Sequence, residues 1–257
     1  MLRENNLKKK IKEGGYALGT FVKFNDPSIA EILGLVGFDF FVLDNEHVAM
    51  NRESMVSIIR SADVTGIVPI VRVRENRQVE ILQALDAGAL GVQVPNVDTI
   101  EDAKNLVNSV KYNPIGKRGF SPTTRAAAYG LFDIKEYVKK SNENTLVVSH
   151  CETVDCINNL DEILKLDQID VIFIGPMDLS QSLGVIGEAN HPKVIESINT
   201  IINKCKAAHK AVGITSTPEK AAEYIKKGVQ YILISTDQGM VISSGKSIIK
   251  TVSESIK

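Results

Sequence analysis

The chain has 257 residues, of which 44% are apolar and 24% charged, as in a globular protein with a sizeable core. Its 30 basic and 31 acidic side chains nearly cancel, which counts against binding nucleic acid or an anionic membrane. There is no apolar run long enough for a membrane span or a signal core, and three cysteines without a CxxC motif make no disulfide framework, so we expect a cytoplasmic protein.

Short β-rich segments recur along the chain, and most are rich in valine and isoleucine without alternating polar residues. This pattern is typical of parallel strands that are buried on both faces. We predict eight strands, at residues 16–22, 39–44, 68–73, 91–95, 145–151, 170–175, 211–215 and 231–235.

The segments between these strands have helical patterns. Residues 26–37 begin with Asp26 as the expected N-cap and Pro27 at the first helical position, and they end at Gly37. The segments 51–66, 76–88, 99–110 and 217–228 follow a similar pattern, several of them with a C-terminal glycine. The basic clusters LKKKIK (7–12), YVKK (137–140) and YIKK (224–227) are interpreted as solvated helix faces.

Eight strands alternating with helices predict one (β/α)₈ TIM barrel domain over residues 1–257. An open, doubly wound sheet is the alternative, because alternation does not establish closure, but no glycine fingerprint of a nucleotide-binding fold is present. Segment 111–144 is the least regular. Its length suggests an active-site loop. Its two arginines, Arg118 and Arg125, either bind a distal carboxylate or are interface charges, and the second role is slightly favoured for Arg118.

In such a barrel the chemistry lies at the carboxyl ends of the strands. Each polar residue there has an ordinary explanation, such as a helix N-cap for Asp44 or Asp178, although Arg72 in an apolar strand requires a buried partner or a ligand. Together they favour an active site. The candidates are Asp44, Glu46 and His47 after strand 2, Arg72 in strand 3, His150, Cys151 and Glu152 at strand 5, and Asp178 after strand 6.

Glu152 and Asp178 follow adjacent strands, and neighbouring carboxylates either share a proton or bind a hard cation. A divalent metal held there could polarise a carbonyl and stabilise an enolate. No zinc-type set of histidines and cysteines is evident, although His150 and Cys151 lie beside Glu152. A Schiff-base mechanism is disfavoured because the predicted strands contain no lysine and only Lys23 comes near. The absence of a glycine-rich phosphate cradle after strand 7 or 8 favours a non-phosphorylated substrate.

At these residues the chain resembles the HpcH/HpaI family of metal-dependent pyruvate aldolases. The resemblance extends over nearly the whole chain, and the D-x-E-H stretch with the later GPxDLS motif is its most specific part. It is carried by GFDFFVLDNEH, PIVRV, GALGVQVPNVDT, YNPIGKRG, HCET, DVIFIGPMDLSQSLG and HPKV.

The resemblance implies retro-aldol cleavage of a 4-hydroxy-2-oxo acid to pyruvate and an aldehyde, through a pyruvate enolate stabilised by Mg²⁺, Mn²⁺ or Co²⁺. Glu152 and Asp178 would be the metal ligands, and Arg72 would face the keto or enolate oxygen. His47 would be the acid/base, acting directly or through a metal-bound water, with Asp44 orienting it and raising its basicity. Backbone N–H groups near Met177 and Asp178 would hold the substrate carboxylate, and Gly175 and Pro176 would also contact the substrate. Loops such as 111–130, alone or with a neighbouring subunit, would select the acceptor aldehyde.

The family also implies a homo-oligomer, a hexamer or trimer of dimers, that exchanges the C-terminal helix at about residues 237–257. Glu46 is either an anchor behind the site or a first-turn helix acid. Where the family often has glutamine this chain has His150, which is a substrate contact, an added metal ligand or a structural replacement. Strand 1 has GTF in place of a motif with tryptophan.

Two other hypotheses about the function remain open. A citryl-lyase-like enzyme or a 2-keto-3-deoxy sugar acid lyase would use the same scaffold with another partner. A barrel that binds a keto acid without catalysis is the non-enzyme alternative.

Overall fold

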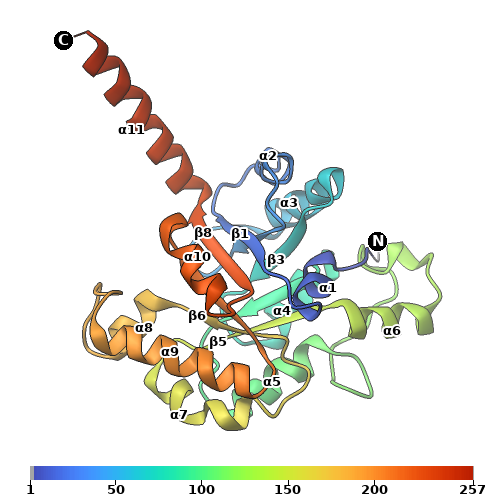
Figure 1. Cartoon of the computed structure of the whole chain (residues 1–257). Coiled ribbons are helices and arrows are strands. Elements are labelled where there is room, and N and C mark those ends of the chain that lie inside the picture. The colour runs from blue at the N-terminus through green and yellow to red at the C-terminus, as the bar shows by residue number, and fades with distance from the viewer. Residues whose placement is uncertain (1–2, 257) are drawn as a thin grey trace.

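The computed structural model describes residues 3–256, and within them eight parallel strands close into a barrel in sequence order (Figure 1). This confirms the predicted TIM barrel and rules out the open sheet. Each predicted strand is present, with ends within one residue of the prediction. The strands are β1 (Ala17–Val22), β2 (Phe40–Asp44), β3 (Val68–Arg72), β4 (Gly91–Val94), β5 (Leu146–His150), β6 (Val171–Ile174), β7 (Ala211–Ser216) and β8 (Tyr231–Thr236).

Helices follow the strands and surround the barrel, and all five helices predicted between strands are present. One detail of the prediction is wrong: the N-cap residue of the first is Pro27, while Asp26 accepts the Ser28 amide through Oδ1 at 2.8 Å. The helical elements are α1 (Asn6–Lys12), α2 (Ser28–Val36), α3 (Arg52–Thr65), α4 (Gln78–Asp86), α5 (Ile100–Val110), η1 (Ala128–Gly130), α6 (Ile134–Asn144), α7 (Val154–Ile163), α8 (Pro176–Ser182), α9 (Pro192–Ala207), α10 (Pro218–Lys226) and α11 (Asp237–Ser255).

The strands separate two cores because successive side chains of a strand point to opposite faces. One core fills the space between strands and helices, and the other fills the barrel interior. The inward-facing positions of β2, β3 and β4 end in Asp44, Arg72 and Gln93, which are register partners across the three strands. The interior is therefore apolar below and polar at the end where the active site was expected.

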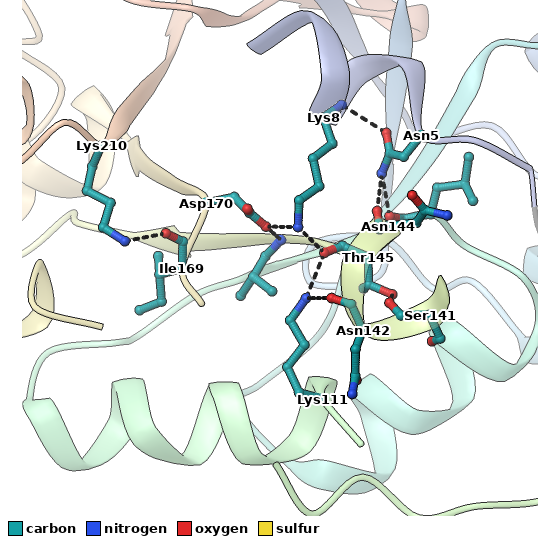
Figure 2. A network of polar contacts seen from close by, with 12 residues as sticks. Asn5, Lys8, Lys111, Ser141, Asn142, Asn144, Thr145, Ile169, Asp170 and Lys210 are labelled. Carbon is teal, nitrogen blue, oxygen red and sulfur yellow. Dashed lines mark hydrogen bonds and ion pairs between the residues drawn. The ribbon is translucent and has the colours of Figure 1, made fainter. Parts of the chain in front are cut away.

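Helix α1 covers the amino-terminal end of the barrel, where Leu7 and Ile11 pack into the interior core. The prediction of a solvated basic face is wrong for Lys8, which is buried. Its Nζ donates to Asp170 Oδ2 at 2.9 Å and to the Thr145 carbonyl at 3.0 Å (Figure 2). A buried ammonium needs such partners, so the lysine ties α1 to the starts of β5 and β6.

A second lysine, Lys111, is buried in the same network. Its Nζ donates to the carbonyls of Thr145 at 3.0 Å and Asn142 at 2.8 Å, so it shares the Thr145 oxygen with Lys8 (Figure 2). Burial, reinforced by the charge of Lys8, lowers the pKa of Lys111 to about 7. The base of the barrel therefore holds more positive charge than Asp170 alone balances.

The irregular segment 111–144 lies at this same end, and the prediction that it is an active-site loop is wrong. It joins α5 to β5, and such helix-to-strand connections lie opposite the catalytic rim. Arg118 pairs with Asp86 at the end of α4 (2.7 Å), and Arg125 pairs with Asp63 in the last turn of α3. These arginines stabilise the base of the barrel rather than line its mouth.

Helix α11 leaves the barrel and extends away from it (Figure 1). Every residue from 241 to 256 is exposed, including apolar side chains such as Ile249 and Val252. Within residues 3–256, no helix combines the length and apolar character required to cross a membrane.

The free energy of unfolding should rise between pH 7 and pH 9. Unfolding returns Lys111 from a pKa of about 7 toward 10.5, so in this window the unfolded chain binds more protons. The lowered pKa values of Lys8 and Lys210 act in the same direction. Measured by urea denaturation, the free energy of unfolding should increase over this pH range by up to about 2 kcal/mol from Lys111 alone.

In Lys111→Met the increase should be clearly smaller, whereas Lys139→Met, at an exposed position of α6, should retain it. Equal increases in wild type and Lys111→Met would contradict this assignment.

Candidate active site

Arg72 is the centre of the polar layer at the carboxyl end of the barrel. Its Nε donates to Asp44 Oδ1 at 3.0 Å, and its Nη2 lies 2.8 Å from Asp44 Oδ2. The guanidinium also stacks on the Phe21 ring at 4.6 Å, and its Nη1 lies 3.2 Å from Glu46 Oε2. The partner that the sequence required for this buried arginine is thus a pair of carboxylates.

Asp44 is fully buried and receives several donors besides Arg72. Its Oδ1 accepts the backbone amides of Glu46 (3.1 Å) and His47 (3.2 Å), and Lys23 Nζ lies 3.3 Å from Oδ2. Burial alone would raise the pKa of Asp44, but the hydrogen bond and charge of Arg72 outweigh it and lower that pKa. Asp44 therefore contacts the His47 backbone, whereas the family resemblance implied that it would orient the imidazole.

The His47 imidazole lies at the surface of the site, with its side chain 55% exposed. Its Nε2 is 3.8 Å from Glu46 Oε2, and the same carboxylate oxygen lies 3.2 Å from Arg72 Nη1. Burial raises the pKa of Glu46 despite the nearby Arg72 charge. Glu46 thus lies between the buried guanidinium and the accessible imidazole, in the anchoring position that was one of its two predicted roles.

Glu152 follows β5 and is 7% exposed. His150 Nδ1 lies 2.8 Å from its Oε2, and the Asn96 amide donates to Oε1 at 3.4 Å. Burial opposes ionisation of this carboxyl, but His150, the Asn96 amide and the Arg72 charge outweigh it and lower the pKa of Glu152. The carboxylate is therefore ionised and held on both oxygens.

Glu152 and Asp178 face the same small space, which Gly175 leaves open. A Cβ built on Gly175 would lie 2.9 Å from Glu152 Oε2 and 3.2 Å from Asp178 Oδ2. A side chain there would fill the gap between the carboxylates, so the absence of one leaves room for a shared ligand. Two oxygen donors beside solvent fit a divalent cation that takes its remaining ligands from substrate and water.

The other side chains near Glu152 and Asp178 do not offer further atoms for binding a metal. His150 uses both ring nitrogens, since Nε2 lies 2.9 Å from Gln93 Nε2. Cys151 faces the core between barrel and helices and is fully buried. Among residues 3–256, no group of three or more His, Cys, Asp and Glu side chains is arranged to hold a metal.

A cavity of about 790 Å³ opens over these residues. Its lining includes His47, Arg72 and the stretch Gly175, Pro176, Met177 and Asp178, whereas Asp44, His150 and Glu152 are buried. Farther out the wall is mixed. Ala189, Ile195, Ile198 and Tyr224 give it apolar surface, and the hydroxyl, amide and charged residues are Asn190, Asn199, Thr215, Ser216, Thr217, Lys220, Glu223, Lys227, Ser235 and Thr236.

Three residues that complete the surroundings of Glu152 were not among the predicted site residues: Gln93, Asn96 and Tyr231. Gln93 could have been identified from the sequence, because an amide side chain in a buried strand needs a hydrogen-bond partner. The Asn96 amide contact depends on a positive φ of 56°, and Tyr231 belongs to β8, far away in sequence. Neither of these two contacts has a local sequence signal.

Asp44→Asn should lower the free energy of unfolding by about 3 kcal/mol, because removing one partner of a buried ion pair leaves a desolvated charge. The loss should be at the lower end of the usual range because Glu46 remains beside Arg72. Urea denaturation with Glu162→Gln as control measures this, since Glu162 pairs with Lys165 at the surface and should matter little. Similar small losses in both variants would contradict the central place of the Asp44–Arg72 pair.

Comparison with known proteins gives concordant results. The 2-dehydro-3,6-dideoxy-6-sulfogluconate aldolase of Pseudomonas putida is 35% identical to this chain over 240 residues, which cover 93% of each protein. A 5-keto-4-deoxy-D-glucarate aldolase of Escherichia coli is 32% identical over 248 residues, or 96% of each. The structure of an HpcH/HpaI aldolase/citrate lyase family protein from Burkholderia cenocepacia matches with a TM-score of 0.92 at 27% identity, covering 96% of this chain and 99% of that one.

The model of the HpcH/HpaI aldolase/citrate lyase family matches residues 17–244, which include the whole barrel. The predictions of this family and of a carbon–carbon lyase of the aldolase type are thereby confirmed. The chain belongs to the HpcH/HpaI aldolase/citrate lyase family.

Proposed function

We propose that this protein is a divalent-metal-dependent pyruvate aldolase, which cleaves a 4-hydroxy-2-oxo acid to pyruvate and an aldehyde. The observation that carries the proposal is the pair Glu152 and Asp178, which flank the space at Gly175. Arg72 and His47 line the cavity that opens over this space. Residues 1–257 would act as one catalytic domain.

Glu152 and Asp178 would hold the cation. Two carboxylates with open positions suit Mg²⁺, Mn²⁺ or Co²⁺, because all three accept oxygen ligands. When bound, the metal supplies Lewis-acid polarisation of the substrate carbonyl.

The substrate carboxylate would lie at the start of α8. The first N–H groups of a helix have no partner within it, so the amides of Met177 and Asp178 are available as donors. Gly175 and Pro176 line the same part of the cavity, and Gly175 lets the substrate approach the backbone closely. Arg72 would face the keto oxygen, where negative charge develops as the carbon–carbon bond breaks.

His47 would move the proton. In the cleavage direction it takes the proton of the 4-hydroxyl group, the C3–C4 bond breaks, and C4 leaves as the aldehyde. The electron pair of that bond passes to the pyruvate fragment, and the proton that His47 took up is then delivered to C3. Asp44 would act on His47 by fixing the backbone at residues 46–47 through two amide hydrogen bonds.

Among substrates of this class, 2-keto-3-deoxy sugar acids are favoured. The outer cavity wall offers hydroxyl and amide groups for a polyhydroxylated chain and Lys220 for an acidic end, whereas the charge of Lys227 is balanced by Glu223 at 2.8 Å. The two named relatives carry the names of a sulfogluconate and a glucarate aldolase, both of which refer to acidic sugar derivatives. A 2-oxo acid is thus the small-molecule partner that we propose.

We also propose a homo-oligomer, a hexamer or trimer of dimers, built by exchange of α11. Its exposed apolar residues recur at helical spacing and form one stripe: Val241, Ile242, Ile248, Ile249, Val252 and Ile256. Most helical stability in proteins comes from packing of an amphipathic face, and residues 241–256 have no such packing within one chain. Ile32, Leu35 and Val36 of α2 are likewise exposed and offer a surface of matching character.

The cytoplasm remains the proposed location. Its support is that the three cysteines are free and buried, which suits a reducing compartment.

Asp178→Ala should abolish metal-dependent pyruvate release. Metal-stripped protein would be given a panel of 4-hydroxy-2-oxo acids and 2-keto-3-deoxy sugar acids, with or without Mg²⁺ or Mn²⁺, and pyruvate would be followed with lactate dehydrogenase. Asp155→Ala, another exposed first-turn acid, should retain the activity.

Turnover that does not require metal, or that survives in Asp178→Ala, would contradict the proposal. Release of pyruvate from oxaloacetate alone would keep the enolate chemistry but remove the aldol assignment, and binding of keto acids without any turnover would favour the non-catalytic barrel.

Ile248→Asp combined with Ile249→Asp should lower the molar mass in solution, because charges on the stripe oppose its burial between subunits. Size-exclusion chromatography with light scattering measures this directly. Ser247→Asp places a charge on the opposite face of α11 and should leave the mass unchanged. A monomeric wild type, or an unchanged mass in the double variant, would contradict exchange of this helix.

A further inference from the structure

A buried chain of hydrogen bonds crosses the barrel interior and ends at Glu152. Tyr231 Oη, on β8, donates to Gln93 Oε1 at 2.9 Å. Gln93 Nε2 lies 2.9 Å from His150 Nε2, and His150 Nδ1 lies 2.8 Å from Glu152 Oε2. Tyr231 and Gln93 are fully buried and His150 is 1% exposed, so no solvent competes for these bonds.

The donors and acceptors of this chain fit in one direction. Because the Tyr231 hydroxyl donates to the Gln93 oxygen, the Gln93 amide nitrogen faces His150. An amide NH₂ only donates, so His150 Nε2 must accept, and the imidazole proton is on Nδ1. Nδ1–H then donates to the Glu152 carboxylate. Turning the amide round would deprive the buried tyrosine proton of its acceptor, which is costly in a dry interior.

Packing holds the chain in place. Phe40 and Phe173 lie beside the Tyr231 ring at centroid distances of 4.3 and 5.9 Å, and His150 lies 5.0 Å from Phe173. Gly213 makes room for these rings, since a Cβ there would come within 2.8 Å of Tyr231 Cδ1 and 2.9 Å of Phe173 Cδ2. The imidazole therefore has little freedom to turn away from Glu152.

We propose that Tyr231, Gln93 and His150 form a positioning relay, which holds a neutral Nδ1–H imidazole against Glu152 and so orients that carboxylate for a divalent cation. The proposal rests on the proposed function, in which Glu152 is a metal ligand. It assigns His150 the role of a positioning residue, because both ring nitrogens are engaged away from the cavity. Partners that orient metal ligands typically change metal affinity about 10- to 100-fold when they are lost.

Two measurements on the full-length protein test the relay. Nitrogen-15 NMR of histidine-labelled, metal-free protein reports which ring nitrogen of His150 carries the proton, and His150→Leu identifies its signals among the four histidines. Isothermal titration with Mn²⁺ reports metal affinity. We expect the Nδ1–H form in wild type, and Mn²⁺ binding about 10- to 100-fold weaker in His150→Leu.

Tyr231→Phe is the sharper variant, because it removes one hydroxyl and keeps the ring. It frees the Gln93 amide to turn, so the His150 nitrogen shifts should change and Mn²⁺ binding should weaken, by less than in His150→Leu. Tyr137→Phe is the matched control. It also removes a buried tyrosine hydroxyl, which contacts Tyr112 at the base of the barrel, and should change neither measurement.

A proton on Nε2 of His150 in wild type would overturn the relay. So would Mn²⁺ affinity and histidine shifts in Tyr231→Phe that equal those of wild type. Failure of wild type to bind Mn²⁺ would instead contradict the metal in the proposed function, while the histidine spectrum would still decide the hydrogen-bond direction.

Discussion

A guanidinium buried inside a barrel must be neutralised, and the arrangement of this active site follows from that requirement. Arg72 is held by Asp44 on the neighbouring strand and by Glu46 just beyond it. Since Asp44 also accepts the amides of residues 46 and 47, the same ion pair determines where the loop carrying His47 begins. One carboxylate, that of Asp44, thus positions both the Arg72 guanidinium, which would face the keto oxygen, and the His47 imidazole, which would move the proton.

The two ends of the barrel show different uses of buried charge. At the carboxyl end, carboxylates exceed the neighbouring cations, and Glu152 and Asp178 leave a space at Gly175 that suits a positive ligand. At the amino end, Lys8 and Lys111 exceed Asp170 and bind backbone carbonyls that close the base (Figure 2). The first arrangement is suited to binding and the second to joining α1, β5 and β6.

Much of the fold could be predicted because its signals are local. Buried parallel strands are continuously apolar, and several helices between them carry caps and terminal glycines, so the eight strands and five of the helices between them are evident in the sequence. The candidate residues at the rim could also be identified, because strand ends in a barrel converge. What the sequence did not reveal depends on long-range contacts. Arg118 and Arg125 had no local mark of their partners, Asp86 and Asp63, so the sequence left open whether they bind a substrate carboxylate or lie at an interface. Tyr231 reaches Gln93 across the interior, which neither local sequence could indicate.

We propose that Glu152 and Asp178 together hold a divalent cation beside Arg72. Crystals soaked with MnCl₂ and pyruvate would locate this cation by anomalous diffraction at the manganese edge. We expect a strong peak within coordination distance of both carboxylates, next to Gly175, with pyruvate extending from it toward Arg72. Pyruvate bound in the cavity with no manganese peak between the two carboxylates, or a peak held by other residues, would contradict it.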